Sequence, residues 1–241
     1  MSDRLTLALD GSGPAGSVAV ISGATVLASR QLDNTPIVGK SGRDELFLPM
    51  VASCLEDAGA GVADLERIVC GAGPGSFTSL RIAASIAKGI AVGSGIPLYE
   101  VSSLLLIVAG SAPGRYLATL DAMRGELFAA TFEIDGHGTV SELGPPQIIS
   151  EAAISEVAAS SGAELAGTAA ARAWKAASSA AADHGATLEH LPHARRAAHV
   201  MSSIVAAGKC DLDTWEPMYG RLAEAHVRWE AAHGRPLTSN G

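Results

Sequence analysis

The chain has few cysteines and little positive charge. Its three cysteines, Cys54, Cys70 and Cys210, are odd in number and widely spaced. This pattern favours neither a disulfide framework nor a zinc knuckle, and it predicts a reducing, cytoplasmic setting. A formal net charge of −8 argues against independent binding of nucleic acid, because clustered lysine and arginine bind the phosphate backbone. If RNA is involved, we expect another subunit to hold it.

Signals for membranes and metals are also missing. The chain passes from Met1 to an apolar run within a few residues, without the basic and apolar segments of a signal peptide. The longest apolar segment, residues 77–92, contains Arg81 and Lys88, which argue against a place in a bilayer. The histidines form neither H-x-x-x-H nor H-E-x-x-H, so no metal site is expected.

A glycine-rich turn, residues 71–76 (GAGPGS), comes directly before the apolar segment. Gly73 and Gly75 permit sharp backbone geometry, and Ser76 can cap the first amides of a helix over residues 77–92. The sequence lacks the lysine of a Walker loop and the G-x-S-x-G frame of a nucleophile elbow. Amides at the helix start could cradle an anion, and a simple tight turn from strand to helix explains the residues equally well.

A second glycine turn follows the predicted strand 5–10 (LTLALD). Its glycines formally fit G-x-G-x-x-G, but a β-rich run over residues 17–21 follows instead of a helix, which argues against a dinucleotide site. Asp10 and Ser12 could still hold phosphate, as such hairpins do in nucleotide-binding ATPases. An ordinary glycine hairpin is an equally good interpretation.

The second half begins by repeating the first. Residues 116–121 (YLATLD) again end in an aspartate, and a turn with Gly125 leads to another β-rich run over residues 126–132. The repeat predicts a duplicated α/β unit with a cleft between the halves. Asp10 and Asp121 would then face each other across that cleft.

Two predicted helices, 44–58 and 77–92, are apolar over more than one face and need cover on more than one side. A docked protein partner would cover them, and so would the alanine-rich region 151–186 of the same chain. A last amphipathic helix over 220–233 is expected to pack back on the first half. The residues expected to bind the partner are Leu46, Met50, Cys54, Ile82, Ala83, Ile86, Ala87 and Ile90.

These motifs, taken together, resemble the TsaB (YeaZ) family over nearly the whole chain. The matching segments are LALDGSGPAGSVAV, RDELFLPMV, GAGPGSFTSLRIAASIAKGIAVGSGIPL, VSSL, LDAMRGELFAATF and PMYGR. The resemblance implies an α/β fold of the ASKHA type, the architecture of actin, Hsp70 and the sugar kinases, with two related α/β subdomains. We expect these to span residues 1–110 and 111–241.

The resemblance also implies a role without catalysis, with no catalytic residue and no metal or cofactor of its own. Such proteins pair through the two-helix face with TsaD, which transfers a threonylcarbamoyl group to adenosine 37 of tRNAs reading ANN codons. TsaE is a further partner, tRNA is met indirectly, and the protein alone is expected to form a homodimer. ATP or ADP would bind, if at all, at the junction with TsaD. The nucleotide or anion candidates are Asp10, Ser12, Gly73, Gly75 and Ser76.

The chain departs from the family pattern at two places. Arg43 and Asp44 stand where the family often has histidine and serine, and Met123 stands in place of one arginine of a pair. Two other functions remain open on the residues alone. An independent ATPase or small-molecule kinase would use Asp10 and Asp121, and a self-associating structural protein would use the two-helix face for a homodimer.

Overall fold

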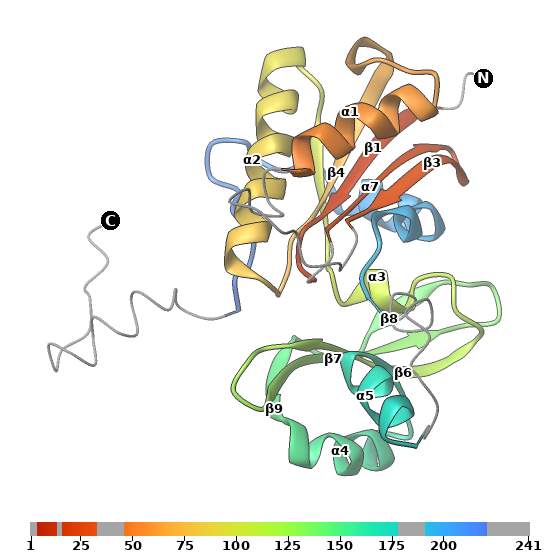
Figure 1. The fold of residues 1–241 in the computed structure, drawn as a ribbon. Coiled ribbons are helices and arrows are strands. Elements are labelled where there is room, and N and C mark those ends of the chain that lie inside the picture. The colour runs from red at the N-terminus through yellow and green to blue at the C-terminus, as the bar shows by residue number, and fades with distance from the viewer. Residues whose placement is uncertain (1–3, 14–15, 33–45, 178–190, 221–241) are drawn as a thin grey trace, which may run out of the picture.

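The computed structural model describes residues 4–13, 16–32, 46–177 and 191–220, which form two β-sheets (Figure 1). In the first sheet the strands run in the order β3-β2-β1-β4-β5. Antiparallel pairing joins β1 to β2 and β2 to β3, whereas β4 pairs with β1 in parallel and β5 with β4 in parallel. The strands are β1 (Leu5–Asp10), β2 (Ser17–Ser22), β3 (Thr25–Gln31), β4 (Leu65–Gly71) and β5 (Leu98–Val101).

The second sheet repeats this plan. Its order is β10-β6-β7-β8, with β9 also paired to β7, and β10 lies parallel to β6 as β4 lies parallel to β1. Two halves built on one plan confirm the predicted ASKHA-type α/β fold. The strands are β6 (Gly114–Asp121), β7 (Glu126–Ile134), β8 (Val140–Glu142), β9 (Gln147–Ser150) and β10 (Glu164–Gly167).

Helices cover both faces of the first sheet. Helices α1 (Phe47–Asp57) and α2 (Phe77–Ser94) lie on one face (Figure 1). There they share a core with Leu7 and Leu9 of β1. Ala8 points to the other face because side chains alternate along a strand, and it packs with η4 (Ala194–His199) and α7 (Met201–Ala207).

The short helix α3 (Leu105–Val108) lies between the two sheets. Leu106 belongs to the core under the first sheet, whereas Ile107 and Val108 pack with Phe128 on the second. The two halves are therefore joined by a continuous apolar segment.

Residues 151–177, the described part of the alanine-rich region, pack on the second sheet and not on α1 and α2, contrary to one of the alternatives raised from the sequence. Its helices α4 (Ile154–Ser161) and α5 (Thr168–Ala177) contribute Ile154, Ala158 and Ala169 to a core with Leu117 of β6. Helices α4 and α5 therefore pack on the second sheet. The remaining short helices are η2 (Val62–Asp64) and η3 (Glu151–Ala153).

The chain then returns to the first sheet through residues 208–220, which we name the C-terminal strap. The Cys210 amide donates to the Leu98 carbonyl (2.8 Å), and the Met218 amide donates to the Ala72 carbonyl (2.7 Å). Between them Trp215 is buried in the core beneath α2. Helix α2 is thus bordered by the sheet, by α1 and by the strap.

Two predictions, a helix near the C-terminus and a subdomain boundary, are not tested by the described residues. The helix expected over 220–233 falls almost wholly outside the described residues, and the boundary at residue 110 stays a prediction. None of the helices in the described ranges has the length and apolar character needed to cross a membrane.

Candidate functional site

Asp10 is completely buried where β1 ends, and each of its carboxylate oxygens has a partner. The Ser12 amide (3.1 Å) and hydroxyl (2.7 Å) donate to Oδ1. The Ser103 hydroxyl donates to Oδ2 (2.6 Å) and accepts a hydrogen bond from the Gly73 amide (3.1 Å). The carboxylate therefore ties together three loops of the first half.

Burial raises the pKa of Asp10 above its ordinary value, while the hydrogen bonds from Ser103 and Ser12 act in the opposite direction. A group with this environment is a structural carboxylate. The hypothesis that Asp10 binds phosphate stays a prediction, and in this conformation the side chain has no exposed surface to offer a ligand.

The glycine turns are shaped by close approach of backbone to backbone. A Cβ on Gly75 would lie 2.3 Å from the Ser12 carbonyl oxygen, and a Cβ on Gly73 would lie 2.3 Å from the Met218 carbonyl oxygen. The Ser76 amide is also occupied, since it donates to Ser12 (2.8 Å). Ser76 itself precedes α2 without a side-chain cap. These contacts favour the structural interpretation of Ser12, Gly73, Gly75 and Ser76 over an anion cradle.

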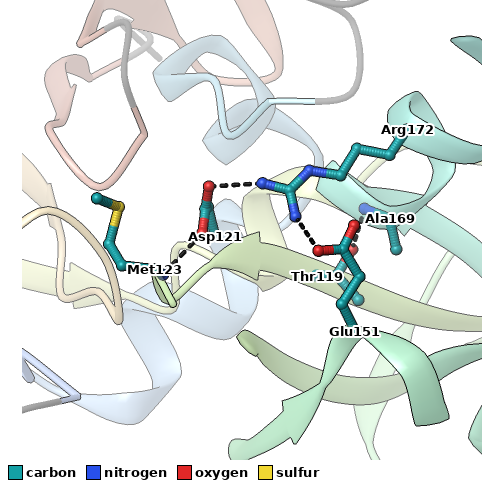
Figure 2. A network of polar contacts seen from close by, with 6 residues as sticks. All are labelled: Thr119, Asp121, Met123, Glu151, Ala169 and Arg172. Carbon is teal, nitrogen blue, oxygen red and sulfur yellow. Dashed lines mark hydrogen bonds and ion pairs between the residues drawn. The ribbon is translucent and has the colours of Figure 1, made fainter. Parts of the chain in front are cut away.

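Asp121 occupies the equivalent place in the second half but is exposed. Figure 2 shows Arg172 of α5 lying between Asp121 (2.6 Å) and Glu151 (2.7 Å). The Met123 amide donates to the other oxygen of Asp121 (2.7 Å). Nearby, Thr119 accepts from the Ala169 amide (2.9 Å) at the start of α5. The network fastens α5 and η3 to the end of β6.

Half of the residues expected to bind a partner lie inside the chain's own core. Met50, Cys54, Ala83 and Ala87 are buried in the folded subunit, so their contact with a partner stays a prediction that their burial disfavours. They repeat at helical spacing on the sides of α1 and α2 that rest on the sheet. Ile82, Ile86 and Ile90 are half-buried against the same core, and Leu46 is exposed.

The residues of α1 and α2 that face away from the sheet form the candidate site. Leu48 is 57% exposed and Val92 is 68% exposed, so each helix presents a large apolar side chain to solvent. A Cβ added to Gly89 or Gly93 would meet nothing within 4 Å, so a second helix could approach α2 closely. We define the α1–α2 face as Leu48, Ala52, Ser85, Gly89, Val92 and Gly93.

Most of this face is absent from the partner-binding residues predicted from the sequence, because that prediction relied on apolar side chains and Ser85, Gly89 and Gly93 are not strongly apolar. A signal was present nonetheless. Ala83, Ala87 and Ala91 form one stripe at intervals of four residues, and all three are buried. Ser85, Gly89 and Gly93 form a parallel stripe two residues further on, which places them across the helix from the buried one.

A pocket of about 850 Å³ lies at the carboxyl end of α2. It is bounded by Val92 and Ile96, by Tyr99 of β5, and by Lys209 and Asp211 of the C-terminal strap. Across the described ranges, no three His, Cys, Asp or Glu side chains gather in a way that could hold a metal ion.

Comparison with known proteins gives consistent matches. Residues 35–204 match the family model described as "TsaD: tRNA N6-adenosine threonylcarbamoyltransferase". The chain is 35% identical over 136 residues to the tRNA threonylcarbamoyladenosine biosynthesis protein TsaB of Escherichia coli, a match that covers 55% of this chain and 56% of that protein. TsaB of Bacillus subtilis is 33% identical over 102 residues, covering 42% and 44%. The chain thus spans about half the length of the curated relatives it matches.

Among solved structures, YeaZ from Pseudomonas aeruginosa superimposes with a TM-score of 0.67 at 23% identity, covering 90% of this chain and 99% of that one. At that identity the superposition supports the fold. A second Pseudomonas aeruginosa structure, described as a protein with similarity to peptidase YEAZ, has a TM-score of 0.66 at 24% identity and covers 90% of this chain and 100% of that one.

Proposed function

The chain belongs to the family of the tRNA N6-adenosine threonylcarbamoyltransferase TsaD, within its TsaB/YeaZ branch, and on this premise we propose that it is a partner subunit for threonylcarbamoylation of tRNA. It pairs with a TsaD-like catalytic paralogue that modifies adenosine 37 of tRNAs reading ANN codons. It supplies no catalytic residue itself.

The α1–α2 face is the observation that carries this proposal. Leu48 of α1 and Val92 of α2 are exposed, and α2 also exposes Gly89 and Gly93. Small residues allow two helices to pack with their backbones close together. A TsaD-like protein of the same fold would present an equivalent pair of helices. Four helices meeting in this way could bury the area of a standard specific interface, about 800 Å² on each partner.

The environment of Asp10 supports the absence of catalysis by this subunit. The first aspartate of the repeated plan is the residue that an independent ATPase would use, and here it is fully buried with both oxygens occupied. The subunit would instead act by stabilising the competent conformation of its partner. We extend the proposal to a TsaE-like ATPase as a further partner, to ATP or ADP at the junction, and to a cytoplasmic setting.

Reconstitution of tRNA modification tests the proposal. Threonylcarbamoylated tRNA would be measured with the TsaD-like subunit and the remaining pathway proteins, with and without this chain. We expect modification to require the chain and to fall at least tenfold with Gly89→Leu, which fills the α1–α2 face. The control is Ala159→Leu on the exposed side of α4, which should leave modification unchanged. Equal modification without the chain would refute the proposal.

A further inference from the structure

An arginine at the start of α2 is held over two aromatic rings. The guanidinium carbon of Arg81 lies 4.3 Å from the centre of the Phe77 ring and 5.3 Å from that of Tyr219 in the C-terminal strap. The two rings are themselves 4.6 Å apart. Arg81 Nε donates to the Tyr219 hydroxyl (3.3 Å). Such contacts restrict the guanidinium to few orientations although the side chain is exposed.

The restrained group retains unused hydrogen-bonding capacity. Nε is the guanidinium nitrogen that bonds to Tyr219, and within the described ranges the two Nη groups form no hydrogen bond or ion pair. A planar pair of N–H donors matches the two oxygens of a carboxylate or the oxygens of a phosphate. An arginine fixed in advance also loses less conformational entropy on binding than a free one.

Arg81 belongs to the same side of α2 as the α1–α2 face. Ser85 and Gly89 follow it at intervals of four residues, and Val92 lies three residues beyond Gly89, so the four share one side of the helix. All four are exposed. A molecule docked on the α1–α2 face would therefore reach Arg81 at the amino end of α2.

The surroundings of Arg81 favour a protein carboxylate over a nucleic-acid phosphate. The other basic residue of α2, Lys88, lies over the Trp215 ring at 5.7 Å. The neighbouring exposed positions, Thr78 and Ser85, are uncharged, and the whole chain carries a net charge of −8. Nucleic-acid surfaces are instead built from several clustered cations.

From this arrangement we propose that Arg81 is a specificity residue, which pairs with a carboxylate that the protein partner places opposite the amino end of α2. This inference rests on the proposed function and identifies the chemistry of the partner. Acidic residues are scarce on α1 and α2, so a second copy of the chain offers few carboxylates for this pairing. Helix α2 contains no acidic residue, and the exposed acids of α1 are Glu56 and Asp57, of which Asp57 already pairs with Arg30 (2.6 Å).

Binding of the full chain to the TsaD-like subunit, measured by calorimetry at low and high salt, tests the proposal. Arg81→Met retains length and apolar contact, and we expect it to weaken binding at least tenfold and to reduce the salt dependence. Arg81→Lys keeps the charge without the planar pair of donors and should weaken binding less. Thermal unfolding of each variant, together with Tyr219→Phe, separates a loss of binding from a loosened strap.

Each outcome decides the question. Binding by the wild type with equal affinity for Arg81→Met would overturn this inference and leave the proposed function intact. Failure of the wild type to bind would instead count against the proposed function. If Arg81→Met weakened self-association as much as it weakened binding to the TsaD-like subunit, Arg81 would belong to a homodimer interface, and the inference would be overturned. If the variant lost tRNA binding while protein binding stayed unchanged, Arg81 would bind phosphate, which would also overturn the inference.

Discussion

Asp10 and Asp121 occupy equivalent places in the two halves, and each accepts a hydrogen bond at Oδ1 from the amide two residues later. Their second oxygens differ in use. Oδ2 of Asp10 is buried against Ser103, whereas Oδ2 of Asp121 forms an exposed ion pair with Arg172. The same turn is thus present in both halves, but its carboxylate is buried in the first half and exposed in the second.

The bond between Ser103 and Asp10 should contribute measurably to stability. Ser103→Ala leaves Oδ2 of Asp10 and the Gly73 amide without a buried partner, while Ser12 still donates to Oδ1, and the loss should lower the free energy of unfolding by about 2 kcal/mol. Urea denaturation would measure the loss. Ser160→Ala on exposed α4 is the control, and an unchanged midpoint for Ser103→Ala would contradict the structural role given to Asp10.

Two glycines should respond in opposite directions to alanine. Gly75→Ala places a Cβ against the Ser12 backbone and should destabilise the chain by about 1–3 kcal/mol. Gly89→Ala enters open space within α2 and should stabilise the isolated chain by about 0.5–1 kcal/mol through helix propensity. Thermal unfolding of both variants checks the signs. Destabilisation by Gly89→Ala would mean that its side of α2 is not open.

His193 should make stability depend on pH in the mildly acidic range. Burial and the nearby charges of Arg195 and Arg196 lower the pKa of His193 from 6.5 to about 4. As the pH falls, His193 therefore becomes protonated in the unfolded chain before it does in the folded chain. The free energy of unfolding is highest above pH 6.5 and decreases by about 3 kcal/mol in total as the pH falls towards 4. Unfolding measured across this range should show the loss.

The matched variant for that experiment is His193→Gln, which keeps an acceptor for the Arg195 amide. It should flatten the dependence between pH 6.5 and 4, although it removes packing as well. His137→Gln, in an exposed turn, should leave the profile unchanged. An equally steep loss in His193→Gln would assign the pH dependence to other groups.

Much of the fold could be predicted because it rests on local patterns. The apolar runs ending in Asp10 and Asp121 indicated a duplicated unit, and the structure shows the same strand plan twice. The helix expected over 77–92 is observed as α2. These features depend on residues close together in the sequence, so periodicity and turn residues suffice to locate them.

The site was harder to predict because it depends on contacts between distant segments. Trp215 and Tyr219 come from the strap, far along the chain from α2. Because α2 is almost wholly apolar, its sequence alone does not distinguish the side that faces the core from the side that faces solvent. The contact with the strap is what distinguishes them. Ala83 and Ala87 were therefore assigned to the partner, although the sheet buries them.

The same distinction changes which substitutions can test pairing. Aspartate at Met50 would bury a charge in the subunit's own core and unfold it. Aspartate at half-buried Ile86 would disturb the core beside it. Val92 is 68% exposed, so a charge there stays in water in the free subunit and loses its hydration only when a partner covers it.

Light scattering with size-exclusion chromatography of this chain mixed with the TsaD-like subunit tests the account most directly. The wild type should form a heterodimer, and Val92→Glu should elute as separate, folded subunits with binding at least tenfold weaker. Ala159→Glu on α4 should pair normally. A heterodimer that forms equally well with Val92→Glu would contradict the assignment of the α1–α2 face as the partner-binding surface.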